Sequence, residues 1–180
     1  MSSVVISGDT SGAITLAAPS VAGTNTITLP AATGTAMVSG NMPAFSAYAD
    51  TAQTISANTL TKVTFGTEEF DTNNNFASSR FTPTVAGYYQ LNAQIYCKTT
   101  ISISNVSFAY YKNGSALIRS LNIAVAAGEP IVNGSCLMYL NGSTDYVEIY
   151  GAISGTGTIT FGFNDSAITS RFSGSMVRAA

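Results

Sequence analysis

The strongest constraint on the fold of this chain is the alternation of apolar and polar side chains. In the segment 87–98, GYYQLNAQIYCK, every second residue from Tyr89 to Cys97 is apolar. Successive side chains of a β-strand point to opposite faces of a sheet, so this spacing predicts a strand with one buried face. Similar runs recur along residues 43–180, and no stretch longer than a turn or two has the period of an amphipathic helix. The chain is therefore predicted to be all-β.

Turn signals divide these runs into short strands. Asn-Gly pairs at 113–114, 133–134 and 141–142 favour tight type I′ hairpin turns. About eight to ten short strands separated by such signals predict a β-sandwich, and specifically a jelly roll, over residues 43–180. The expected strands are 44–48, 59–65, 87–98, 104–112, 115–123, 135–140, 145–153, 158–163 and 171–177.

Charged residues are scarce in this chain. They make up 9% of its 180 residues, against about 25% in ordinary soluble domains, while hydrophobic residues make up 46%. A monomer with this few charges is poorly protected against self-association. We therefore expect burial of surface in an oligomer or larger assembly. The net charge of −2 gives no reason to expect nucleic acid as a partner. We find no secretory signal and no apolar run near the roughly 18 residues of a membrane helix, so no membrane insertion is expected.

The first 42 residues form a separate segment with a different character. Only Asp9 is charged before Pro43, and the unit Ile-Thr-Leu occurs twice, at 14–16 and 27–29. The segment could be a disordered linker, but β-branched residues and the near absence of charge argue against that. It could be an aggregation-prone tail, although such tails are normally interrupted by charges. The favoured interpretation is an extended β-rich stem whose strands pair with copies of themselves or with another protein, with anchoring residues Ile14, Leu16, Ile27 and Leu29.

The residues available for catalysis are few. The chain has no histidine, which excludes Ser-His-Asp and Cys-His nucleophiles and histidine-containing zinc sites. Cys97 and Cys136 both lie in apolar alternating runs, so buried free thiols are favoured over a disulfide, and assembly in a reducing compartment is expected. We therefore expect no enzymatic activity.

One acidic cluster, EEFDTNNNF at 68–76, is the candidate metal site. Glu68, Glu69 and Asp71 are the carboxylates that could hold a structural calcium ion or, in principle, supply a glycosidase pair. The spacing is not that of an EF-hand, because Phe76 stands where that loop needs glycine and Thr82 where it needs glutamate. A solvated loop is the favoured interpretation, and no other cofactor is expected.

The tyrosines are candidates for a sugar-binding surface. Aromatic faces stack well on the apolar faces of carbohydrates, and Tyr88, Tyr96 and Tyr111 are the candidate contacts with a glycan. Tyrosines at strand spacing more often fill cores and subunit interfaces, so interface packing is favoured over glycan contact.

Residues 43–180 resemble the globular head domain of complement component one q, which shares its jelly roll with tumour necrosis factor. AFSAY at 44–48 resembles the opening strand of that family and RFSGSMV at 171–177 its closing strand. The resemblance implies a compact homotrimer packed around a threefold axis, but transfers no immune ligand. The residues that match the family signature are Phe65, Asp71, Phe76, Phe81, Gly87, Tyr89, Phe172 and Gly174.

The segment GTNTITLPAATGT at 23–35 is similar to a sequence that recurs in bacteriophage fibre and virion structural proteins. This resemblance implies a virion protein assembled in the bacterial host cytoplasm and attached to other virion proteins through residues 1–42. The expected function is a short homotrimeric fibre, spike or decoration protein that displays its head, with a host cell-surface glycan as a further partner. The alternative is a soluble bacterial carbohydrate- or protein-binding module of the same head family. A depolymerising tail-spike enzyme is disfavoured, since that class needs a long β-helix with paired carboxylates.

Overall fold

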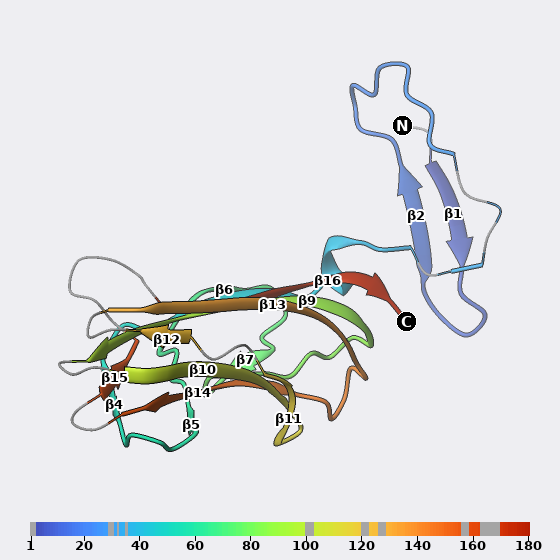
Figure 1. The fold of residues 1–180 in the computed structure, drawn as a ribbon. Helices are drawn as coiled ribbons and strands as arrows, with labels where there is room; N and C mark the ends of the chain where they lie inside the picture. Colours follow the sequence, from blue (N-terminus) through green and yellow to red (C-terminus); the bar gives the residue numbers. More distant parts are fainter. Residues whose placement is uncertain are drawn as a thin grey trace. The chain divides into compact units, whose positions relative to one another are not determined.

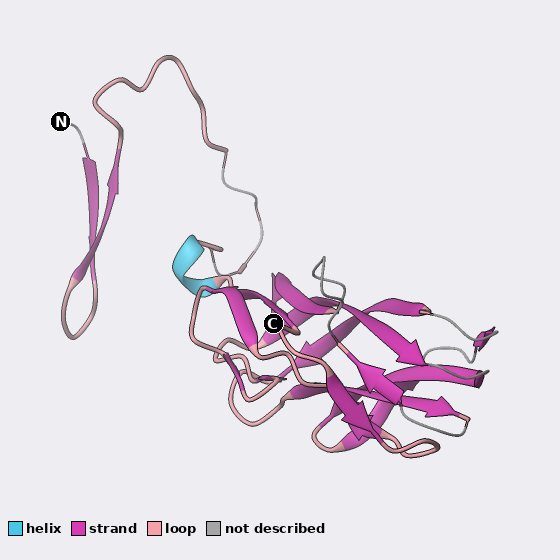
Figure 2. Ribbon diagram, turned by 90° about the vertical axis from the view of Figure 1, so that its left-hand side faces the viewer, coloured by secondary structure: helices cyan, strands magenta, loops and turns pink. Residues whose placement is uncertain are grey.

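The computed structural model describes residues 3–28, 31, 33–34, 36–99, 103–119, 123–125, 129–155, 159–162 and 170–180. The chain divides after Gly34 into two compact units, an N-terminal unit of residues 1–34 and a head of residues 35–180. Strands make up nearly all of the regular structure, and the one helical turn among the described residues is the 3₁₀ turn η1 at Ser39–Asn41 (Figure 2). The prediction of an all-β chain is confirmed.

The N-terminal unit is a two-stranded antiparallel hairpin. Strand β1 (Ser3–Ser7) pairs with β2 (Ala13–Ala17). Four apolar side chains share one face of this hairpin, because Val4 lies opposite Leu16 and Ile6 opposite Ile14. Each of the four is more than half exposed. A two-stranded hairpin is only marginally stable by itself, so this face needs a further surface to cover it.

The head consists of two sheets that form separate layers (Figure 1). In the first, which we call the β9 sheet, the order is β4-β15-β9-β16-β3-β6, and β13 also pairs with β9. In the second, the β14 sheet, the order is β11-β10-β14-β8-β7, with β12 on β10 and β5 on β14. The strands of the β9 sheet are β3 (Ala44–Tyr48), β4 (Gln53–Ile55), β6 (Thr67–Asp71), β9 (Gly87–Thr99), β13 (Ile131–Leu140), β15 (Ile159–Phe161) and β16 (Arg171–Ala179). Those of the β14 sheet are β5 (Thr61–Lys62), β7 (Phe76–Ala77), β8 (Arg80–Phe81), β10 (Ile103–Lys112), β11 (Ser115–Arg119), β12 (Ile123–Val125) and β14 (Val147–Ser154).

The core of the head lies between the sheets and contains a cluster of aromatic rings. Phe45 of β3 stacks on Phe81 of β8, with ring centroids 4.3 Å apart, and meets Phe172 of β16 edge to face at 4.9 Å. The predicted alternation of the long run is confirmed, since each apolar residue from Tyr89 to Cys97 on the expected face is buried. The strands that open and close the head, β3 and β16, are therefore joined both by backbone pairing and by their rings.

The predicted turn at 133–134 is wrong. Asn133 and Gly134 lie inside β13, paired with Gln94 and Ala93 of β9, rather than in a hairpin loop. Glycine is needed here for close packing: a Cβ on Gly134 would lie 2.5 Å from the ring of Phe108. The Asn113-Gly114 turn is confirmed, with φ of 53° and 77° at its two residues, as a type I′ turn requires.

The segment that precedes β3 belongs to the head. Met37 packs against the hydrophobic core of the head, and the Asn73 side chain donates a hydrogen bond to the Gly40 carbonyl at 3.2 Å. The division of the chain after Gly34 therefore lies before the expected boundary at 42/43.

Both cysteines are buried free thiols. Cys136 of β13 lies opposite Leu91, six residues from Cys97 along β9 and hence about 20 Å from it, so the two cannot form a disulfide with each other. Burial raises the pKa of Cys97 to about 12 and the pKa of Cys136 to about 11.

Native protein is therefore expected to react negligibly with a thiol reagent such as 5,5′-dithiobis(2-nitrobenzoate) at pH 8, because the thiolate fraction is on the order of one in a thousand or less. In guanidinium chloride both thiols are expected to react. Absorbance of the released thiolate measures the number modified. Rapid modification of either thiol in native protein would contradict this assignment.

Candidate interaction surfaces

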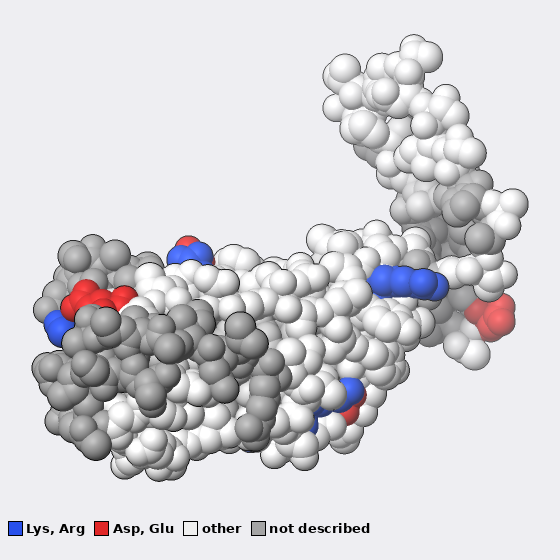
Figure 3. All heavy atoms as spheres, viewed as in Figure 1, with Lys and Arg blue, Asp and Glu red and all other residues white. Residues whose placement is uncertain are grey.

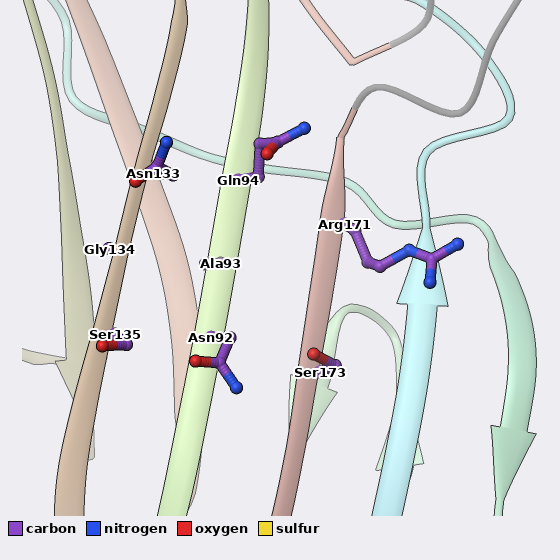
Figure 4. Close-up of a pocket in the computed structure, with 8 residues that line it drawn as sticks. All are labelled: Asn92, Ala93, Gln94, Asn133, Gly134, Ser135, Arg171 and Ser173. Atoms are coloured by element: carbon purple, nitrogen blue, oxygen red, sulfur yellow. The ribbon is translucent and has the colours of Figure 1, made fainter.

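The outer face of the β9 sheet carries a shallow depression lined mainly by uncharged polar side chains. It has a volume of ≈ 550 Å³ and spans three neighbouring strands, β13, β9 and β16 (Figure 4). Asn92 lies opposite both Ser135 and Ser173 in the sheet, so these polar groups form a row across it. The other residues that line the depression are Ala93, Gln94, Asn133, Gly134 and Arg171.

Exposed apolar side chains lie at one end of the same face. Tyr88 and Tyr139 are directly opposite each other on β9 and β13, their ring centroids are 5.6 Å apart, and they are 41% and 42% exposed. Leu137 beside them is 57% exposed. Ser46 of β3 is buried, and its hydroxyl has no hydrogen-bond partner among the described residues. The face thus has exposed apolar groups that a partner could cover.

Charge is sparse on this face, although the exposed Arg178 of β16 lies directly opposite Tyr88. The ion pair of Arg171 and Glu69, at 3.2 Å, lies beside the depression, and both side chains are nearly half exposed. In the view of Figure 3, charged groups are few and scattered over the described surface of the head. Removing such a surface from water carries a small desolvation cost, because few charges lose their hydration.

The outer face of the β14 sheet is organised around one buried carboxylate, that of Glu148. Its Oε1 accepts hydrogen bonds from Lys62 Nζ at 2.6 Å and from Arg80 Nε at 2.9 Å. Strands β5 and β8 both pair with β14, which places Lys62 opposite Tyr150 and Arg80 opposite Glu148. Burial raises the pKa of Glu148, but the hydrogen bonds from Lys62 and Arg80 outweigh this and hold it below its usual value. Two cations therefore share one ionised carboxylate.

The structure does not gather the predicted metal ligands into one site. Asp71 closes the β6–β7 turn, since its carboxylate accepts the N–H of Phe76 at 2.7 Å and that of Asn73 at 3.3 Å. Glu69 pairs with Arg171, and Glu68 is exposed. Among the described residues no three acidic, cysteine or histidine side chains are placed to hold a metal ion. The expected structural calcium remains a prediction without a site.

The three tyrosines proposed as glycan contacts do not form one surface. Tyr88 is exposed on the β9 sheet, whereas Tyr111 lies on the β14 sheet, with its ring 4.1 Å from that of Tyr150. Tyr96 is only 3% exposed, so its assignment as a glycan contact is wrong. Its backbone N–H donates to the Ser170 hydroxyl at 2.8 Å, and its carbonyl accepts the Gly162 N–H at 3.0 Å.

The anchoring residues and the family signature are placed as follows. Ile14 and Leu16 lie on the apolar face of the hairpin, Ile27 is 88% exposed, and Leu29 lies outside the described residues. The signature residues that the structure brings into the core of the head are Phe65, Phe76, Phe81, Tyr89 and Phe172. Gly87 and Gly174 allow close approach, because a Cβ at either would lie 2.4 Å from a neighbouring atom. Sequence reasoning missed the Glu148 cluster, since its members are far apart in the chain and no motif joins them.

Three solved structures have the same arrangement of strands. The globular domain of zebrafish complement 1qA protein matches with a TM-score of 0.54 and 18% identity, over 77% of this chain and 99% of that one. The fold of the head is that jelly roll. The Eiger TNF of S. frugiperda matches this jelly roll with a TM-score of 0.57 and 10% identity, over 78% of this chain and 95% of that one. Murine APRIL matches with a TM-score of 0.57 and 9% identity, over 76% of this chain and 99% of that one. The predicted jelly roll is confirmed, and identities this low establish the fold alone.

No protein-family model and no curated protein sequence matches the chain. Among the described residues there is also no helix with the length and hydropathy that crossing a membrane would require.

Proposed function

We propose that this protein is a non-enzymatic, homotrimeric structural protein that displays its jelly-roll head and is anchored through residues 1–42. The observation that carries the proposal is the outer face of the β9 sheet, which is poor in charge and has Tyr88, Leu137 and Tyr139 exposed on it. Interfaces are depleted in charge at their centres and enriched in aromatic residues, which matches this face. In a closed ring, each copy covers the apolar groups of its neighbour.

The hairpin of the N-terminal unit supports the same assembly. Its apolar face, formed by Val4, Ile6, Ile14 and Leu16, is uncovered within its own unit. In a trimer three such faces are available to cover each other or to dock together on a larger protein. Either arrangement covers the exposed apolar face of the hairpin, which is otherwise a liability for aggregation.

We place the trimer in a bacteriophage virion, as a short fibre, spike or decoration protein. The support is the similarity of the segment 23–35 to virion structural proteins, together with the low charge of the whole chain. Three identical heads on one stem suit weak multivalent attachment to a host cell surface, with a glycan as the partner. The second candidate is a soluble bacterial binding module of the same fold. It is favoured only if residues 1–42 prove dispensable and sensitive to protease.

Leu137→Arg is expected to convert the trimer to monomers, because an unpaired charge would then be buried at the centre of the contact. Native mass spectrometry of the full chain measures the oligomeric state directly. The dissociation constant of the trimer is expected to rise at least about a hundredfold in the variant. Leu117→Arg is the matched control, since Leu117 of β11 is 53% exposed on the other sheet. A wild-type monomer, or a trimer unaffected by Leu137→Arg, would refute the proposed interface. Labelling of virus particles by antibodies against the head would then test the virion assignment separately.

A further inference from the structure

We propose that the head binds an acidic sugar, bearing a carboxylate or a phosphate, in a depression at the β7–β8 edge of the β14 sheet. The depression has a volume of ≈ 430 Å³, within the usual range for small-ligand sites. Such a site would give the proposed attachment to a host surface a location and a ligand class. Only its biological purpose rests on that proposed function. The lining residues are Lys62, Asn74, Asn75, Ala77, Ser78, Arg80, Thr82 and Thr84.

The charge of the lining favours an anion. Two of the lining residues, Lys62 and Arg80, are cations, and none is acidic. Glu148, whose side chain is 4% exposed, pairs with both cations but carries one negative charge, so it neutralises only one of the two positive charges. An ammonium has three donors and a guanidinium five, so several N–H groups remain after those bonds. A planar carboxylate or a phosphate matches such a guanidinium fork.

The two cations are held in place before any ligand arrives. Arg80 is fixed on two sides, by Glu148 and by the ring of Tyr146, whose centroid lies 3.9 Å from the guanidinium carbon. Lys62 is fixed by its 2.6 Å contact with Glu148. Binding then orders few side chains, which removes one of the main costs of association. The buried carboxylate thus acts as a positioning group for the anion-binding cations.

The rest of the lining is uncharged and suited to sugar hydroxyls. Asn74, Thr82 and Thr84 contribute an amide and two hydroxyl groups. Beside them, Ser78 and Ser79 adopt left-handed backbone conformations, with φ of 50° and 58°, in the turn between β7 and β8.

These positions of a two-residue hairpin turn favour asparagine and glycine, as the chain itself has at Asn113 and Gly114. The Ser79 hydroxyl accepts the Phe65 N–H at 2.9 Å, and this hydrogen bond explains why a serine stands at position 79. Ser78 lines the depression instead. Backbone strain retained at a ligand-facing position is typical of binding sites.

Saturation-transfer NMR of the full chain with glucuronate, glucose 6-phosphate and glucose tests the proposal. We expect a Kd of about 1 mM for at least one acidic sugar and no saturable binding of glucose. The ratio of the two acidic sugars tells whether a carboxylate or a phosphate is preferred. Equal binding of glucose would overturn the proposal, as would no binding of either acid.

Two variants and a matched control locate the site. Lys62→Met is expected to weaken acid binding about tenfold, through loss of a charge-assisted hydrogen bond. Ala77→Glu places a negative charge on the lining, directly opposite Arg80 in the β7–β8 pair, and it is expected to abolish binding by repelling the anion and competing with it for Arg80. Lys98→Met is the matched control, because Lys98 is 58% exposed and lies outside the depression.

Unchanged affinity in folded Lys62→Met and Ala77→Glu would overturn the site. Circular dichroism confirms that each variant is folded. Binding to a single head does not require the trimer, so this test and the assembly test fail independently.

Discussion

Phe172→Ala is expected to lower the free energy of unfolding by about 4 kcal/mol, the largest effect of any single change considered for this protein. Phe172 is fully buried, and its ring contacts those of Phe45 at 4.9 Å, Phe65 at 5.8 Å and Phe76 at 6.0 Å. Truncation removes a large buried apolar area and leaves a cavity between two sheets. Strand pairing fixes the backbones around it, so the cavity can collapse only in part.

Urea denaturation followed by circular dichroism measures this effect, at one fixed chain concentration because assembly adds to apparent stability. Val177→Ala is the matched control, since Val177 lies on the same strand but is 54% exposed. Its expected cost is below about 1 kcal/mol. Equal midpoints for the two variants would contradict the central role of the aromatic cluster.

Glu148→Gln is expected to lower the free energy of unfolding by about 2–3 kcal/mol. The amide keeps the shape of the side chain but leaves Lys62 and Arg80 without a negative charge. Breaking a buried ion pair costs about 3–5 kcal/mol, and we take a smaller figure because both cations keep partial contact with water. Glu69→Gln is the matched control: its pair with Arg171 is exposed, so a cost below about 1 kcal/mol is expected.

The pH dependence of stability gives a second measure of Glu148. Its pKa in the folded protein lies below the ordinary value of 4.5. The stabilisation is therefore fully present above pH 4.5 and is lost as the pH falls through the folded pKa. Asp145 and Asp50 also have lowered pKa values, so a slope will remain in the variant. The difference in stability between wild type and Glu148→Gln is expected to shrink as the pH falls below 4.5, as measured by thermal denaturation across pH. A difference that stays constant would contradict the ionised state of Glu148.

Sequence patterns predicted the structure correctly where the physical cause of the structure is local to a few neighbouring residues. Alternation predicted the buried face of β9 because neighbouring side chains of a strand must point to opposite sides. The Asn113-Gly114 turn was predicted because these residues tolerate positive φ. The same reasoning was wrong at Gly134, where glycine serves to admit the ring of Phe108 from the facing sheet. The sequence alone does not distinguish a glycine needed for its backbone conformation from one needed for space.

The sequence by itself determined that this chain is all-β, that its head is a jelly roll, and that the chain is poor in charge. These properties follow from strand periodicity, composition and a signature carried by a few residues. Only the tertiary structure decided that Tyr96 is buried and that Glu148 meets Lys62 and Arg80, which are 86 and 68 residues away in the chain. Such contacts between distant residues depend on which strands pair and in which register. Register is set by the summed packing of two whole sheets, and no local pattern encodes it.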